Sequence, residues 1–140
     1  MRIIIANQDS SFRFALQMFF QTQENMKVVA EIARVGELLR DASSVAPDLI
    51  LMDWDLPDIE HFSLGGRHNK STGTPNLNQV KAVVISSLHN IESKPMILVT
   101  DNHQDDLLPA LYSGADGFLY TGEMSSKLPT ILKSLIQKLE

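Results

Sequence analysis

Short apolar runs alternate with stretches of helical periodicity along most of this chain. The runs at 49–52 and 96–99 are continuously apolar, and a shorter run follows at 117–120. Continuous apolar runs of this length are typical of strands that are buried on both faces of a parallel sheet. Two further β-rich runs, at 2–6 and 28–33, bring the predicted strands to five.

Helical periodicity fills the intervals between these strands. Asp9 can cap the first helix, and five apolar residues then recur at helical spacing: Phe12, Ala15, Leu16, Phe19 and Phe20. Further helices are predicted from Gly36, over 76–89 and over 125–139. A fourth helix, before the last strand, contains Pro109, which should delay or kink it because proline lacks the backbone donor.

This alternation of strands and helices predicts a single α/β domain over residues 1–140. Its expected architecture is a doubly wound, five-stranded parallel sheet with helices on both faces. One segment, 63–75, interrupts the rhythm because it is polar, rich in glycine and without a period. We expect that segment to be a flexible loop inserted in the domain.

Composition narrows the classes of function. The chain of 140 residues is 44% hydrophobic and 21% charged, which is enough apolar material for a core. The formal net charge of -5 argues against direct binding to nucleic acid and against docking on an anionic membrane. Without cysteine the chain has no disulfide or thiolate metal site. The absence of a long apolar run leads us to expect a cytoplasmic protein.

A candidate site is expected at the carboxyl ends of the predicted strands, where open parallel sheets place their reactive groups. The polar residues at these positions are Asn7, Gln8, Asp9, Asp53, Thr100, Asp101 and Thr121.

The segment 48–57 resembles the third strand and acceptor loop of response-regulator receiver domains. In that family an aspartate at the strand end accepts a phosphoryl group and a proline follows four residues later, as Asp53 and Pro57 do here. Thr100 matches the switch hydroxyl of the family, and Phe118 matches its aromatic switch position. The resemblance covers the chain except the polar loop, and it implies the flavodoxin-like strand order 2-1-3-4-5.

The resemblance also shows where this sequence departs from the family. Asn7 and Gln8 stand where the family has an acidic pair that holds a magnesium ion, and Thr121 stands where it has a lysine. Magnesium favours carboxylate oxygens, and phosphoryl transfer needs cations to neutralise the developing charge. We therefore expect too few anionic oxygens for a metal ion at Asp53, and no cation beside it.

With help from Asp55 or Asp101, Asp9 is the residue most able to restore part of the site. It lies one position beyond the usual acidic pair, and a shifted loop would bring its carboxylate toward Asp53. A metal ion, if present, would then use Asp53 and Asp9. We favour the other interpretation, in which Asp9 caps the first helix, and so expect no metal or other cofactor.

Two hypotheses of function follow. The first is an atypical, stand-alone receiver domain without enzymatic activity, which acts in two-component (phosphorelay) signalling as a phosphorylation-independent protein-interaction module. Its partner would be a histidine kinase or another signalling protein. The alternative is a Mg²⁺-dependent phospho-acceptor that a histidine kinase phosphorylates on Asp53. The sequence leaves open whether two copies of the chain form a homodimer.

Overall fold

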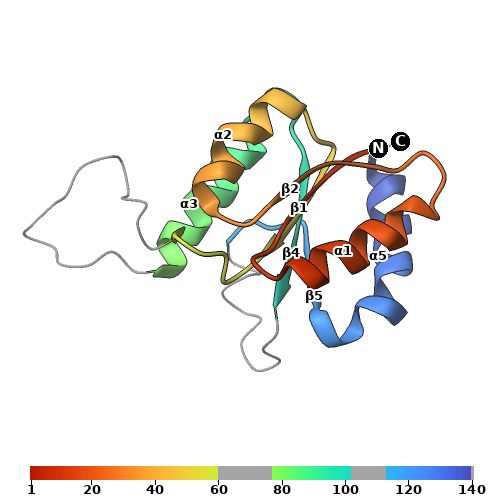
Figure 1. Cartoon of the computed structure of the whole chain (residues 1–140). Coiled ribbons are helices and arrows are strands. Elements are labelled where there is room, and N and C mark those ends of the chain that lie inside the picture. Colours follow the sequence, from red (N-terminus) through yellow and green to blue (C-terminus); the bar gives the residue numbers. More distant parts are fainter. Residues whose placement is uncertain (60–76, 102–112, 140) are drawn as a thin grey trace, which may run out of the picture.

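A computed structural model describes residues 1–59, 77–101 and 113–139 of the chain. The described residues form one sheet whose neighbouring strands are all parallel, in the order β2-β1-β3-β4-β5 (Figure 1). The strands are β1 (Arg2–Ala6), β2 (Lys27–Ile32), β3 (Leu49–Asp53), β4 (Met96–Asp101) and β5 (Gly117–Tyr120). The predicted architecture and the strand order implied by the resemblance are both confirmed.

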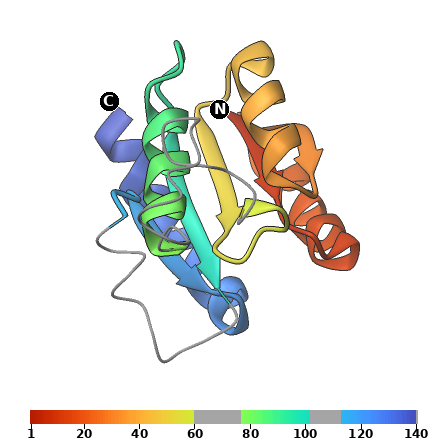
Figure 2. The same ribbon diagram turned by 90° about the vertical axis from the view of Figure 1, so that its left-hand side faces the viewer.

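Helices cover both faces of the sheet. α1 (Ser10–Gln21) and α5 (Met124–Leu139) lie against one face, and α2 (Val35–Val45) and α3 (Leu77–His89) lie against the other (Figure 1). In Figure 2 the molecule is turned so that α2 and α3 lie in front of the strands. A short 3₁₀ turn, η3 (Thr121–Glu123), joins β5 to α5. None of the described helices is long and apolar enough to cross a membrane.

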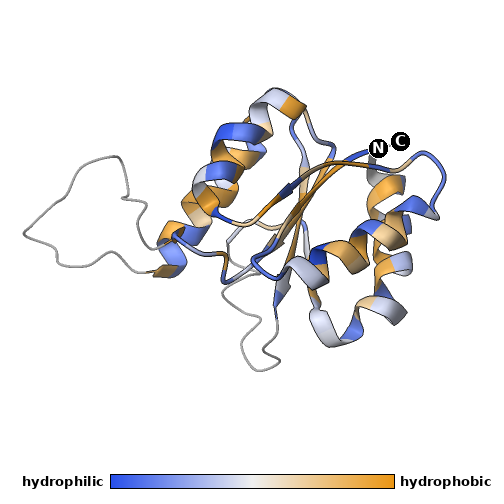
Figure 3. Ribbon diagram, in the orientation of Figure 1, coloured by the Kyte–Doolittle hydropathy of each residue, from blue (hydrophilic) through white to orange (hydrophobic). Residues whose placement is uncertain are grey.

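The core has two layers, one on each face of the sheet, because successive strand residues point to opposite faces. Ile4, Ile50 and Val99 pack with buried residues of α2 and α3, while Ile3, Leu51 and Leu98 pack with those of α1 and α5. Figure 3 shows the apolar residues on the strands and on the helix faces turned toward them. This double burial explains why the central strands are continuously apolar in sequence.

Some element boundaries differ slightly from those predicted. The second strand lies one residue earlier than 28–33, because the amide of Asn7 donates to the Ile32 carbonyl at 2.9 Å and closes the ladder there. α2 begins at Val35 rather than Gly36, since Val35 is fully buried and Arg34 is still extended.

Two other predictions concern the helices. Of the stripe predicted on α1, Leu16 and Phe20 are buried, Phe12 and Phe19 are half-buried and Ala15 is exposed. The predicted loop at 63–75 and the predicted kinked helix around Pro109 lie outside the described residues, so both stay predictions.

Hydrogen bonds and buried side chains hold the segment that follows β3 against the rest of the fold. The amide of Trp54 donates to the Thr100 carbonyl at 2.8 Å, and the Pro57 carbonyl accepts from the amide of Val35 at 3.2 Å. Leu56 and Ile59 are buried in the core on the side of α2 and α3. These contacts fix the direction of the chain as it leaves the end of β3.

Candidate functional site

The residues predicted to form a site do end up at one edge of the sheet, where the strands terminate. Asp53 is the last residue of β3 and lies in register with Thr100 of β4. Asp101 is the last residue of β4 and lies in register with Tyr120 of β5. Asn7 follows β1 directly and is buried. The parallel topology therefore places these polar groups together at the carboxyl edge.

Asp53 is a buried carboxyl at this edge. The residue is 6% exposed, and its Oδ1 accepts a hydrogen bond from the amide of Asp55 at 3.2 Å. Burial raises the pKa of Asp53 to about 6, and the negative charges of Asp55 and Asp101 add to this, while the hydrogen bond and the Lys81 ammonium oppose it. Ionising Asp53 in the folded protein therefore costs more free energy than ionising it in water.

Lys81 supplies a cation that the sequence analysis missed. It lies in α3, its Nζ is 3.2 Å from Oδ1 of Asp55, and its side chain is only 4% exposed. The same Nζ lies 4.4 Å from the centre of the Trp54 ring, within the range of a cation–π contact. The expectation that no cation remains beside Asp53 is therefore wrong, because the cation comes from α3 rather than from the position of Thr121.

A signal for Lys81 was present in the sequence. The buried residues of α3 are Val80, Lys81, Val84, Ile85 and Leu88, which form one core-facing stripe. Lys81 is the charged member of that stripe, and a lysine is almost never fully buried unless it is paired. A charge in a core-facing position of a helix therefore indicates an acidic partner in the adjacent layer.

Of the two residues at the usual acidic pair, Asn7 is engaged in local structure. Oδ1 of Asn7 accepts from the amide of Asp9 at 2.8 Å, which shapes the turn between β1 and α1. Gln8 is exposed. The guanidinium of Arg13 donates to the Asn7 carbonyl and also lies 3.5 Å from Oε1 of Glu31. The side-chain oxygen of Asn7 is thus already used within the protein.

Asp9 caps α1, as the favoured interpretation predicted. Its Oδ1 accepts from the amides of Ser11 at 3.0 Å and Phe12 at 3.3 Å, and its backbone is extended. These bonds satisfy donors that the first turn of a helix leaves open. The carboxylate is directed at its own helix.

The switch positions of the family are placed by the sheet. Thr100 is fully buried next to Asp53, and Phe118 is half-buried and packs against the core on the side of α2 and α3. Thr121 begins η3 directly after β5, so a neutral hydroxyl stands where the family has its lysine.

The site does not fit a magnesium ion. Asp55 is paired with Lys81, the amide oxygen of Asn7 is occupied by the amide of Asp9, and the Asp9 carboxylate caps α1. In the described parts of the chain, no group of three or more His, Cys, Asp or Glu side chains is arranged to hold a metal ion. Magnesium demands near-octahedral oxygen ligands, which these engaged groups do not offer.

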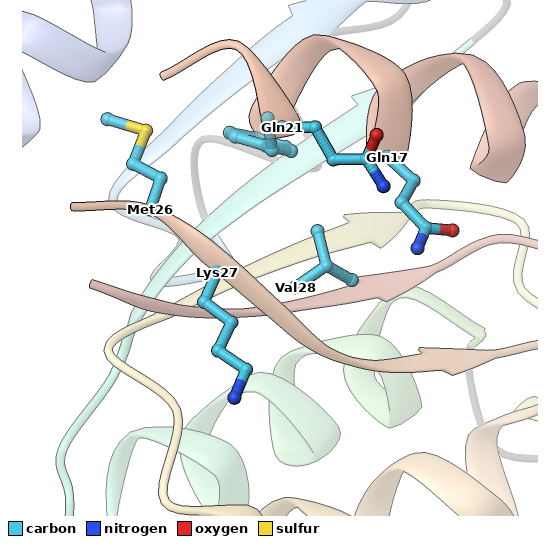
Figure 4. A pocket seen from close by; sticks show the side chains of 6 residues that line it. Gln17, Gln21, Met26, Lys27 and Val28 are labelled. Carbon is cyan, nitrogen blue, oxygen red and sulfur yellow. The ribbon is translucent and has the colours of Figure 1, made fainter. Parts of the chain in front are cut away.

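A hollow lies at the opposite end of the strands, between α1 and the start of β2 (Figure 4). It measures about 170 Å³ and is lined by Gln17, Phe20, Gln21, Met26, Lys27 and Val28. Pockets for small ligands usually exceed roughly 300 Å³. This hollow lies at the amino ends of the strands, away from the polar groups described above, and we assign it no function.

Several known proteins are similar to this chain. No protein-family model matches the chain. It is 27% identical over 118 residues to the uncharacterized transcriptional regulatory protein YhcZ of Bacillus subtilis, covering 84% of this chain and 47% of that protein. It is 26% identical over 115 residues to the response regulator protein VraR of Staphylococcus epidermidis, covering 82% of this chain and 52% of that protein. The chain therefore spans about half the length of these curated relatives.

A solved structure agrees in fold. The isolated REC domain of RcsB from Salmonella enterica serovar Typhimurium, in the apo form, superposes with a TM-score of 0.73 at 15% identity. The match covers 99% of this chain and 89% of that one. At this level of identity the likeness shows the fold alone.

The cap on α1 gives a first prediction. Asp9→Ala should lower the free energy of unfolding by about 1 kcal/mol, because two helix amides lose their acceptor, whereas Asp9→Asn should leave it nearly unchanged. Urea unfolding of the three proteins measures both values. Equal losses for Ala and Asn would show that the charge of Asp9, and not its capping oxygen, is what the fold needs.

The buried carboxyl of Asp53 gives a second prediction. Because folding raises its pKa from 3.8 to about 6, the stability tied to this group is full at low pH and is lost as the pH rises through about 6. Asp53→Asn removes the ionisation and should stabilise the protein by roughly 2–3 kcal/mol at about pH 8, with the gain vanishing near pH 4. Denaturant titrations of both proteins across this pH range test it. A pH-independent difference would show that the carboxyl is not held above its ordinary pKa.

Proposed function

We propose that this chain, which is a response-regulator receiver domain of two-component signalling, acts as a protein-interaction module that does not require phosphorylation. Its partner would be a histidine kinase or another signalling protein, and the contact would depend on the folded surface rather than on a modified Asp53. The proposal includes the view that this chain itself carries out no catalysis.

The observation that carries the proposal is the state of the acidic-pair position. Phosphoryl transfer to an aspartate requires groups that neutralise the charge on the transferring oxygens. Here the amide of Asn7 is used inside the turn, Asp9 caps α1, and Thr121 is neutral. A single missing stabilising group in such a site typically costs roughly 2–4 kcal/mol, so the combined losses favour a domain that works without the transfer.

The alternative, a Mg²⁺-dependent phospho-acceptor, has one observation in its favour. Asp53 keeps the strand-end position, and the fully buried Thr100 lies in register beside it. Burying this carboxyl raises its pKa and so lowers stability at neutral pH. A role as phospho-acceptor would give a reason for keeping it there. The two functions differ in whether Asp53 becomes covalently modified, which can be measured directly.

Phosphorylation is tested by incubating the protein with acetyl phosphate and magnesium chloride and recording its intact mass. The proposed function predicts no adduct of one phosphoryl group, in the wild type or in Asp53→Asn. A hydroxylamine-labile adduct that forms in the wild type and is absent from Asp53→Asn would establish the alternative.

Magnesium binding is tested through Trp54, the one tryptophan of the chain, which is 6% exposed and follows Asp53 directly. Its fluorescence should stay flat during a titration with magnesium chloride through the millimolar range, because the site offers no set of open carboxylates. Sodium chloride at equal ionic strength serves as the control for salt. A saturable response to magnesium that is lost in Asp53→Asn contradicts the proposal.

A further inference from the structure

Two large apolar side chains are exposed next to each other on α1. Phe14 is 63% exposed and Met18 is 50% exposed, and neither belongs to the core on either face of the sheet. They lie four residues apart, so they are neighbours on one face of the helix. Leu77 and Val83 are the other large apolar residues exposed in the described chain, and their spacing of six residues directs them to different sides of α3.

The face of α1 around this pair carries no charge. Arg13 is the one charged residue of the helix, and its guanidinium is turned toward the Asn7 carbonyl and the Glu31 carboxylate. The exposed residues of α1 are therefore all uncharged: Ser10, Ser11, Phe14, Ala15, Met18 and Gln21. Buried centres of protein interfaces are depleted of charge and enriched in aromatic residues and methionine, as this face is.

The absence of charge on this face indicates what can cover it. A charged partner surface would find no complementary charge here, so the face matches another uncharged apolar face. The chain itself supplies one. A two-fold interface brings the same patch of both copies together, and a charge near the axis would then oppose its own copy. Two chains of net charge -5 repel each other, and an uncharged face is where they can approach at the least cost.

We propose that two copies of this chain associate through α1, with the two helices antiparallel across a two-fold axis and Phe14 of one copy against Met18 of the other. The axis lies midway between these positions along the helix, so each contact occurs twice. A thioether beside an aromatic ring is a favourable contact. The inference goes beyond the proposed function, and the association requires no phosphorylation.

The size of the contact sets its expected strength. A helix of 12 residues is about 18 Å long, so one helix from each copy makes a contact below the roughly 1,200 Å² of stable complexes. We therefore expect weak, reversible association, with a dissociation constant between about 1 μM and 1 mM.

Sedimentation velocity of the full chain at protein concentrations from about 10 μM to 1 mM tests the association. The wild type should change from monomer to dimer over this range. Sodium chloride should strengthen the dimer, because it screens the repulsion between two chains of net charge -5. A wild type that stays monomeric at about 1 mM in high salt overturns the proposal.

Single charged substitutions test whether α1 is the interface. Phe14→Lys and Met18→Glu should each weaken association at least about tenfold, because each buries an unpaired charge. Both positions are exposed, so both variants should fold, which circular dichroism checks. Val83→Lys and Val83→Glu change the net charge equally on α3, which lies on the other face of the sheet, and should dimerise as the wild type does. Equal losses in the Val83 variants would overturn the role of α1.

An equimolar mixture of the Phe14→Lys and Met18→Glu proteins tests the antiparallel arrangement. In a mixed pair the introduced lysine opposes the introduced glutamate, while the remaining Met18 and Phe14 still meet. The mixture should therefore associate at least about tenfold more tightly than either variant alone. A mixture that associates no better than its components overturns the arrangement.

The outcomes are separate from those for the proposed function. A wild type that dimerises and forms no acyl phosphate supports both. A monomeric wild type without the adduct overturns the inference and leaves the phosphorylation-independent function standing. An acyl phosphate on Asp53 in a protein that already dimerises without it overturns the proposed function and leaves the α1 interface standing.

Discussion

The structure of this site depends on one constraint: the carboxylate of Asp53 is taken out of water at the end of the central strand. Burial of a charge in a medium of low polarizability is costly unless hydrogen bonds and an opposite charge offset the loss of hydration. The amide of Asp55 provides the hydrogen bond and Lys81 the charge, while the bond from Trp54 to the Thr100 carbonyl fixes the loop that carries both Trp54 and Asp55. The loop after β3 and the first turns of α3 are therefore arranged around this carboxylate.

The constraint also explains why the amides at the acidic-pair position are compatible with the fold. Two more ionised carboxylates, at the positions of Asn7 and Gln8, would add to the repulsion that Asp53 already experiences from Asp55 and Asp101. Asn7 is neutral and its oxygen accepts from the amide of Asp9, so it adds no charge to those of Asp55 and Asp101, which raise the pKa of Asp53. The neutral residues at the acidic-pair position and the buried Lys81 therefore both limit the net negative charge around Asp53.

Sequence alone was sufficient for the features that depend on local pattern. Strands buried on both faces must be continuously apolar, so 49–52 and 96–99 identified β3 and β4, and the capping role of Asp9 follows from its residue type and its place before a helix. The strand order came from resemblance, because periodicity does not say which strands are neighbours. Lys81 was missed because its partner, Asp55, lies 26 residues earlier in the chain. No rule of sequence spacing relates two residues that are so far apart. The apolar stripe of α3 marks Lys81 as core-facing, but the sequence does not say which carboxylate of the adjacent layer pairs with it.

A cation inside the site changes which interactions can shift the domain from one conformation to another. A ligand shifts an equilibrium only by the difference in its affinity for the two states. In a receiver that binds metal and phosphoryl groups, that difference arises at the carboxyl edge. Here Lys81 is paired with Asp55 and lowers the pKa of Asp53, so part of the negative charge at this edge is already offset within the folded domain. Because Lys81 links α3 to the loop after β3, a partner that displaces α3 would expose the carboxylates it compensates and work against that electrostatic cost. The ion pair thus favours one arrangement of α3 relative to the loop after β3.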